Sequence, residues 1–360
     1  MAIAGVGNGS LAWLIAQSST LKTQLGTLSA QSVDGKRGTF YGDIAGQAGR
    51  AINLRGGVAR GEAHAQAIDR ALSRTTIAQS TMTQLSSIAE NFLTQAGKIS
   101  RADTSRISAL ADSARQAIGQ VASLLNAKSG SDYLFSGADT ANPPIPDPDG
   151  IMATPMAQGI ADAVASLAPG NGDAVNAAAL AAASSTAPGD TPFSDYLLDP
   201  ARGRQDARPN VLAEDGQAVA VGLFANRNAT EPANPGSPEE GGWSRDLLRG
   251  LMTLASLTPD KTASGQDFDK VLGGITGALK SAMTGLGVES GALGMSEAKL
   301  EAAKTRHEEL GVTLKTQLAD VEEVDLASTL AAMQDTQNRL QASWKALSML
   351  SGLSLTQFLR

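Results

Sequence analysis

The chain has 360 residues, no cysteine and a formal net charge of −7. The absence of cysteine excludes disulfides, thiolate catalysis and cysteine-ligated metals, and the acidic balance disfavours nucleic acid and anionic membranes as partners. Aromatic residues make up only 4% of the chain, and alanine and leucine supply most of its apolar content. This composition favours long helices packed side by side.

The first predicted element is a helix that starts near residue 11. Its apolar residues recur in steps of three and four, the spacing that forms one stripe along a helix. Residues 1–33 carry only one charge, on Lys22, so we expect this helix to be covered on several sides within an assembly; a flexible Ser/Thr-rich tail is the alternative. Lys22 follows the apolar stretch, so no cleavable signal peptide is predicted. The stripe contains Leu11, Leu14, Leu21, Leu25 and Leu28.

A glycine-rich stretch, residues 35–57, interrupts this helical order and predicts a hinge or spoke between two helical layers. Helical spacing returns over residues 58–128, with a break near residues 97–103 and with Asp103 or Thr104 as the N-cap of the second helix. Its stripe contains Ile107, Leu110, Ala114, Ala117, Val121 and Leu124.

An irregular insert follows, since 13 of the 14 prolines lie between residues 143 and 238. Residues 153–187 are rich in alanine and predict either helix or disorder. Residues 211–213 and 217–223 predict a β-hairpin, because Asp215-Gly216 is a turn pair and alternate residues after it are apolar.

Helices return after the insert. Ser244 is a predicted N-cap, and a helix over residues 266–283 is expected to end at a group of glycines between residues 285 and 294. Residues 296–350 predict a final long helix, and no stretch of 18 apolar residues is present to span a bilayer. The stripe on this last helix contains Leu326, Leu330, Met333, Leu340, Trp344 and Leu347.

These elements predict a mainly α fold with a small β-containing insert, in which long antiparallel helices from both termini form coiled-coil or rod layers. We expect residues 1–33 and 318–360 to form a terminal coiled-coil domain. Residues 34–140 and 243–317 would form a helical rod domain, and residues 141–242 an outer α+β insert domain. The leucine stripes near the two ends would pair, and they are the predicted assembly interface.

No catalytic, cofactor or metal site is predicted. His64 and His307 lie on separate helical stretches, and neither has a second histidine one turn away. The acidic residues from Asp320 to Asp325 lack the spacing of a calcium loop, so a solvated helix face is the better interpretation. We therefore expect a protein that is not an enzyme.

The proline-rich insert is opened by Tyr133-Leu134-Phe135-Ser136-Gly137. This motif resembles one found in bacterial hook–filament junction proteins, the hook-associated protein 3 family, which are relatives of flagellin. The segment 321–327, Val-Glu-Glu-Val-Asp-Leu-Ala, resembles the sequence that leads into the terminal helix of the flagellin superfamily, and residues 350–355 resemble its terminal signature. Leu28-Ser29 followed by Gly35-Lys36-Arg37 is similar to the exit from the first helix of that family.

The resemblance implies a structural role at the junction of hook and filament, outside the cell, after type III export without cleavage. Implied partners are further copies of the chain, a neighbouring hook-associated protein, flagellin and an export chaperone. Two alternatives remain open: a flagellin that fills the filament, and a cytoplasmic coiled-coil adaptor. The adaptor is disfavoured by the nearly uncharged first helix, because a specific dimer is expected to carry charges beside its seam.

Overall fold

The structure is a computed structural model that describes residues 6–38, 40–203, 206–228 and 242–358, with side chains described between residues 12 and 349 of these ranges. It divides into two compact units. The terminal unit comprises residues 1–63 and 307–360. The central unit comprises residues 64–306.

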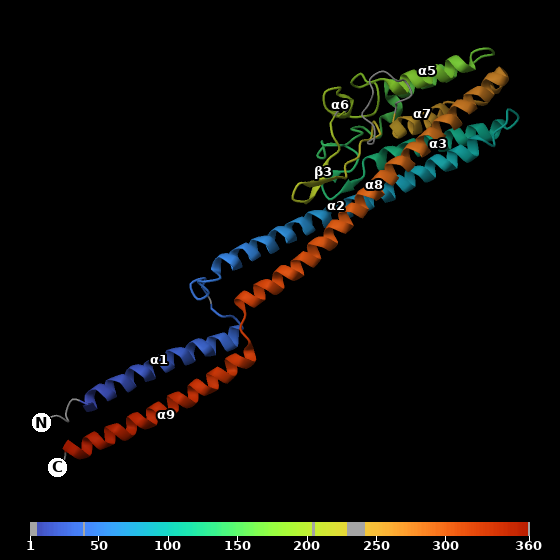
Figure 1. The fold of residues 1–360 in the computed structure, drawn as a ribbon. Coiled ribbons are helices and arrows are strands. Elements are labelled where there is room, and N and C mark those ends of the chain that lie inside the picture. The colour runs from blue at the N-terminus through green and yellow to red at the C-terminus, as the bar shows by residue number, and fades with distance from the viewer. Residues whose placement is uncertain (1–5, 39, 204–205, 229–241, 359–360) are drawn as a thin grey trace. The chain divides into compact units, whose positions relative to one another are not determined.

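The terminal unit contains two helix pairs, and each pair joins distant parts of the sequence. In one pair, α1 (Val6–Asp34) and α9 (Leu326–Phe358) lie side by side (Figure 1). The other pair is formed by the first turns of α2 (Ala48–Ala96) and the last turns of α8 (Gln266–Glu322). An apolar cluster between α2 and α8 contains Ala51, Leu54 and Val321.

The connection that follows α1 and the connection between α8 and α9 lie next to each other in the terminal unit. Gly35 follows the end of α1 with a φ of +69°, a left-handed conformation that glycine adopts without steric cost. Lys36 forms an isolated antiparallel bridge with Glu323, which lies between α8 and α9. The Val324 N–H donates a 2.9 Å hydrogen bond to the Gly35 carbonyl. The two connections are therefore hydrogen-bonded to each other.

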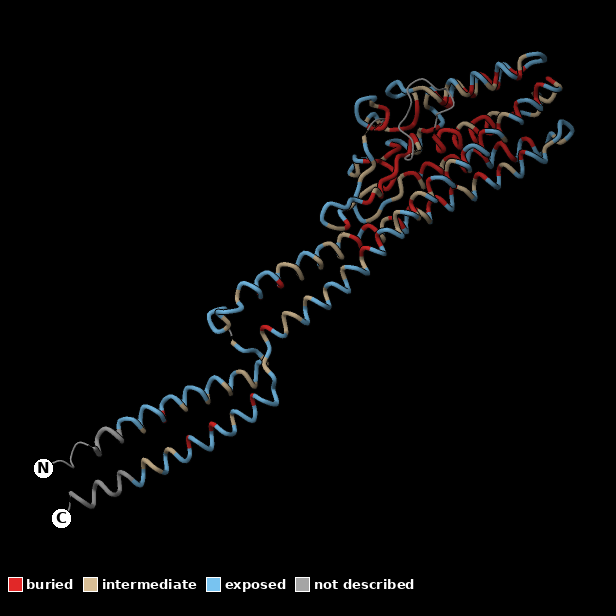
Figure 2. The backbone as a smooth tube through the Cα atoms, in the orientation of Figure 1, coloured by how far each residue is buried: buried red, intermediate tan, exposed pale blue. Residues whose placement is uncertain are grey.

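The central unit contains the main hydrophobic core (Figure 2). Helix α3 (Thr104–Leu125) packs against α7 (Gly242–Ala255), and α4 (Pro155–Ala165) and α5 (Gly172–Ser184) pack against each other and against α7. The alanine-rich part of the insert is thus helical, and its helices share a core with α3 and α7. Five residues of the predicted α3 stripe are buried: Ile107, Leu110, Ala114, Ala117 and Val121.

Short elements complete the central unit. The predicted hairpin forms, with β3 (Asn210–Glu214) antiparallel to β4 (Gln217–Ala220) and a φ of +83° at Gly216 in the turn. The fold class expected from the sequence is confirmed: mainly α, with a small β insert and terminal helices that pack together. The other short elements are β1 (Lys128–Ser129), β2 (Asp132–Tyr133), α6 (Asp195–Leu198) and two 3₁₀ helices, Ile151–Ala153 and Pro259–Ser264.

The expectation that glycines end a helix near residue 285 was wrong, because α8 continues through them to Glu322. A Cβ at Gly285 would lie 2.7 Å from the Trp243 Cβ, so this glycine allows α7 to approach closely. Leu286 and Leu293 are buried on the same helix, and their burial offsets the roughly 1 kcal/mol that each helical glycine costs.

Three other expected boundaries also differ from the structure. Residues 296–350 do not form one helix, because residues 323–325 separate α8 from α9. Gly56-Gly57 lies within α2 and does not break it. Ser244 is not an N-cap: α7 already begins at Gly242, and the Ser244 hydroxyl donates to the Ala225 carbonyl.

Helix α8 is long and apolar enough to cross a membrane by length and composition alone. Of its most apolar stretch, 39% is buried inside the fold. Core helices pass the same test, so this property is weak evidence for a membrane span.

Candidate assembly interface

The stripe predicted on α1 faces into the helix pair. Leu14, Leu21, Leu25 and Leu28 are partly buried, and Ser18, between the first two, is buried. These positions are separated by steps of three and four, so they form one seam along α1. The side chain of Leu11 lies outside the described residues.

On α9, the seam that contacts α1 differs from the predicted one. Leu340 is 4% exposed, and Met333 and Leu347 are partly buried, so these three lie on the seam. Leu326 and Leu330 are each 49% exposed and Trp344 is 54% exposed, so these three lie outside it. The buried and partly buried positions again follow steps of three and four. They are Thr329, Met333, Thr336, Leu340, Ser343 and Leu347, with Ala346 partly buried beside Leu347.

Thr336 explains why the seam runs through small polar residues. Its hydroxyl donates a 2.8 Å hydrogen bond to the Ala332 carbonyl of the same helix. A buried hydroxyl that is satisfied in this way does not carry the cost of an unpaired polar group. Thr336 can therefore occupy the seam at little cost, whereas the buried Ser343 hydroxyl on the same seam has no hydrogen-bond partner among the described residues.

The terminal unit exposes most of the large apolar side chains on the described surface. Of 17 such exposed side chains, 12 belong to this unit, although it is the smaller of the two. Helix α1 shows the same property, with Trp13 64% exposed and Ile15 53% exposed. Its 29 residues contain only two charged side chains, Lys22 and Asp34. A surface so poor in charge and rich in apolar groups is typical of an interface with other chains.

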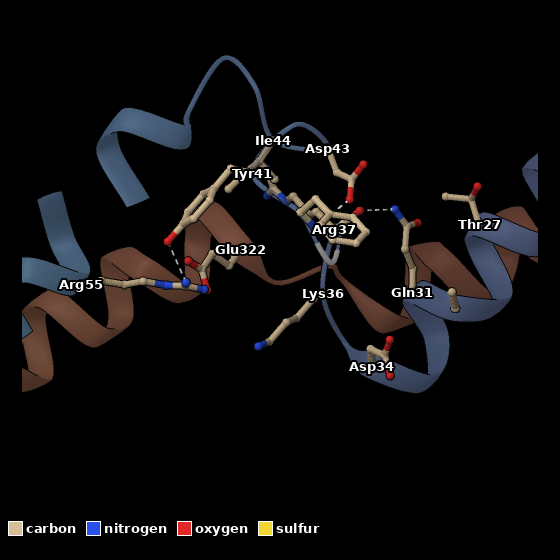
Figure 3. A pocket seen from close by; sticks show the side chains of 13 residues that line it. Thr27, Gln31, Asp34, Lys36, Arg37, Tyr41, Asp43, Ile44, Arg55 and Glu322 are labelled. Atoms are coloured by element: carbon tan, nitrogen blue, oxygen red, sulfur yellow. Dashed lines mark hydrogen bonds and ion pairs between the residues drawn. The ribbon is translucent and has the colours of Figure 1, made fainter. Parts of the chain in front are cut away.

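A cavity of about 840 Å³ opens in the terminal unit where α1 leads into the connection to α2. Figure 3 shows Arg55 of α2, Tyr41 of the connection and Glu322 of α8 meeting at one end of it. Arg55 donates a 2.8 Å hydrogen bond to Glu322 and a 2.9 Å hydrogen bond to the Tyr41 hydroxyl. The hydrogen bond that Arg55 donates to Glu322 is the main cause that raises the pKa of Arg55 above its ordinary value.

This arrangement braces the connection that contains Tyr41 against α2 and α8. Arg55 and Tyr41 are both occupied, and sequence reasoning missed their partnership because Tyr41 lies in a connection without periodic spacing. Among the described residues, no group of three or more His, Cys, Asp or Glu side chains is arranged to hold a metal ion.

His64 has a local structural contact in the central unit. Its Nδ1 lies 3.4 Å from the Leu212 carbonyl oxygen, and its Nε2 lies 3.3 Å from Asp215 Oδ1. Both partners belong to the β3–β4 hairpin, so His64 holds this hairpin against α2. The His64 side chain is only 15% exposed.

The Tyr133-Leu134-Phe135-Ser136-Gly137 motif is an internal brace of the central unit. Leu134, Phe135 and Ser136 are buried. The Gly137 N–H donates to the Leu223 carbonyl at 2.9 Å, and the Phe135 carbonyl accepts from the Ala225 N–H at 2.7 Å. The two edges of the insert are therefore joined through this motif.

Comparison with known proteins adds one observation that bears on this interface. Residues 276–359 match the bacterial flagellin C-terminal helical region. The match spans most of α8, the connection of residues 323–325 and the whole of α9 with its seam. No curated protein matches the chain.

This flagellin match supports a place in the flagellin superfamily and a structural role in the bacterial flagellum. It points to a structural, non-enzymatic protein. Flagellins assemble into polymers outside the cell, so the match also implies self-assembly and an extracellular location on the flagellum.

Proposed function

We propose that this chain is the subunit that joins the hook to the filament, and that it polymerises through its terminal unit. The observation that carries the proposal is the concentration of exposed apolar side chains in that unit. In a single copy these groups remain in water, and in a polymer neighbouring copies cover them at a gain of about 25 cal/mol for each Å² buried.

The predicted interface residues have two roles in this proposal. Leu14, Leu21, Leu25 and Leu28 hold α1 to α9 within one copy, together with Met333, Leu340 and Leu347. Leu326, Leu330 and Trp344 face outward and contact neighbouring copies. Leu11 stays in the proposal as a continuation of the α1 seam.

The Tyr133–Gly137 motif favours a junction subunit over a filament subunit, because it resembles the junction family. A filament flagellin is the second candidate, and the match of residues 276–359 to the flagellin C-terminal region supports both equally. Both candidates share export by the type III route and an export chaperone; for the junction subunit, a hook-associated protein and flagellin are the neighbours.

Immunogold electron microscopy separates these candidates. An antibody against residues 141–228 would be applied to intact flagella, with flagella from a strain that lacks the gene as the control. We expect a single band of label where the hook meets the filament.

Label along the whole filament would identify the chain as flagellin and would reject the junction role. Label confined to the cytoplasm of sectioned cells would reject both flagellar roles and favour the coiled-coil adaptor.

A further inference from the structure

The two compact units differ in charge. The terminal unit contains ten Lys or Arg residues and ten Asp or Glu residues, so its formal charge is zero. The central unit contains 19 basic and 26 acidic residues and carries the whole net charge of −7. Identical terminal units therefore have no net repulsion to overcome when they pack together.

Within the terminal unit, however, the two signs are separated between two helices. The segment that leads into α2 and forms its first turns, residues 35–63, has five basic and two acidic residues. The end of α8 and the following connection, residues 307–325, have six acidic residues and one lysine. One helix pair therefore has a basic member and an acidic member.

Two ion pairs join these helices inside the chain, and only the Arg55–Glu322 pair follows this charge pattern, because the other places its acid, Glu62, on α2 and its base, Lys315, on α8. Arg55 lies 2.8 Å from Glu322, and Lys315 lies 2.8 Å from Glu62. The earlier α2 residue, Arg55, pairs with the later α8 residue, Glu322, and the later α2 residue, Glu62, pairs with the earlier α8 residue, Lys315, as expected for antiparallel helices. The two helices therefore lie within ion-pair distance of each other along this stretch.

The remaining charges of the two helices are exposed. On α2, Arg50 and Arg60 are exposed, and on α8, Glu309 and Asp320 are exposed. None of the four has an ion-pair partner within 4.0 Å among the residues that the structure describes. Each copy therefore presents an unused basic face, Arg50 and Arg60, and an unused acidic face, Glu309 and Asp320.

The spacing of the two faces is similar. At 1.5 Å per residue, Arg50 and Arg60 are separated by about 15 Å along α2, and Glu309 and Asp320 by about 16 Å along α8. When α2 of one copy runs antiparallel to α8 of another, Arg50 can face Asp320 while Arg60 faces Glu309. Both pairs can therefore form in one contact.

We propose that the basic face of α2 in one copy docks on the acidic face of α8 in the next copy. This inference rests on the proposed function, because it requires that copies assemble. The contact joins two different surfaces, so it repeats from copy to copy and forms a ring or a helical array. It also fixes the order of neighbours, since two basic faces or two acidic faces repel each other.

Obligate co-assembly tests this contact. One variant carries Arg50→Glu and Arg60→Glu, and the other carries Glu309→Lys and Asp320→Lys. In cells that lack the native gene, each variant alone brings like charges together at every contact. When the two are co-expressed, alternating copies again place opposite charges at every contact.

We expect each variant alone to lower the amount of the chain in sheared flagella on the order of tenfold, and co-expression to restore it. A matched control carries Lys280→Glu and Lys299→Glu, which make the same charge change on exposed residues of α8 in the central unit; this control should assemble normally. Circular dichroism of the purified variants should match that of the unchanged chain, so misfolding can be separated from failed docking.

Normal assembly of either variant alone would overturn the docking contact and leave the proposed function intact. Loss of assembly that co-expression does not restore, with both variants folded and exported, would overturn it as well. By contrast, normal flagella in cells that lack the gene would reject the proposed function itself.

Discussion

Gly137 lies directly against the ring of Phe224, and a Cβ at position 137 would overlap the ring. Its φ of +63° adds a second requirement for glycine. The contact fixes the end of the Tyr133–Gly137 motif against the far edge of the insert, where Phe224 also pairs with Ser136 in an isolated bridge.

Gly137→Ala should lower the free energy of unfolding of the central unit by about 3 kcal/mol or more, because Phe224 has to move and the backbone is strained. Gly130→Ala is a matched control, since Gly130 has a φ of +64° and open space around its Cα. It should cost only about 1 kcal/mol. Urea unfolding of both variants measures the difference, and equal losses would contradict the steric argument.

Leu340 and Trp344 should affect different steps of assembly. Leu340 is buried in the α1–α9 seam, so Leu340→Ala should cost about 2 kcal/mol or more of stability in the terminal unit, and Leu340→Asp should abolish assembly while the central unit stays folded.

Trp344 is exposed, so Trp344→Ala should leave the stability of the isolated chain unchanged and reduce its incorporation into flagella. Thermal melts followed by circular dichroism, together with the content of sheared flagella, test both. Normal swimming of the Leu340→Asp strain would contradict the seam.

Asp267 should make the central unit sensitive to acid. The Gly170 N–H and the Gly172 N–H donate to its carboxylate at 2.6 Å and 3.0 Å, and these bonds lower the pKa of Asp267 below its ordinary value. A carboxyl with a lowered folded-state pKa stabilises the fold above its unfolded pKa, about 3.9, and this stabilisation is lost as pH falls through the folded-state value.

The urea midpoint of the central unit should therefore fall on acidification below about pH 4, and Asp267→Asn should flatten that fall. Asp269→Asn is the control on the same helix, since the Asp269 carboxylate is half-exposed and lies 3.3 Å from Arg101. If the two variants had the same acid dependence, the contacts of Asp267 with Gly170 and Gly172 would not be its cause.

The Arg55–Glu322 pair should respond unequally to the loss of either partner. Arg55 is 47% exposed and Glu322 is 11% exposed at the side chain. Without Arg55, a largely buried carboxylate loses its partner, whereas without Glu322 the guanidinium can still reach water. Arg55→Ala should therefore cost more stability than Glu322→Ala, and a double-mutant cycle should give a coupling of about 1 kcal/mol or less. Equal single-variant losses would contradict the asymmetry.

Sequence reasoning was strongest where local chemistry decides the structure. Asp215-Gly216 predicted a turn because the turn requires a left-handed residue, and Gly216 has that conformation. The break before Thr104 was also predicted, because polar and glycine residues interrupt the helical spacing there. Both features depend on a few neighbouring residues and little on tertiary contacts.

Sequence reasoning was weaker where a tertiary contact decides between two structures that the local sequence allows. Glycine at position 285 indicates a helix end by itself, and only the proximity of Trp243 shows why the helix continues. On α9, two neighbouring stripes fit the same spacing. The apolar one was predicted, but Thr336 lies on the seam because its hydroxyl is satisfied by its own helix.

The bridge between Lys36 and Glu323 holds the connection after α1 beside the connection between α8 and α9. A tilt of the α1–α9 pair there would deform residues 35–38, 40–47 and 323–325 and leave the leucine seam intact. Under the proposed function, copies on the inner and outer sides of a curved polymer would need different tilts. The paired connections are where one copy could adjust to either position without unfolding a helix.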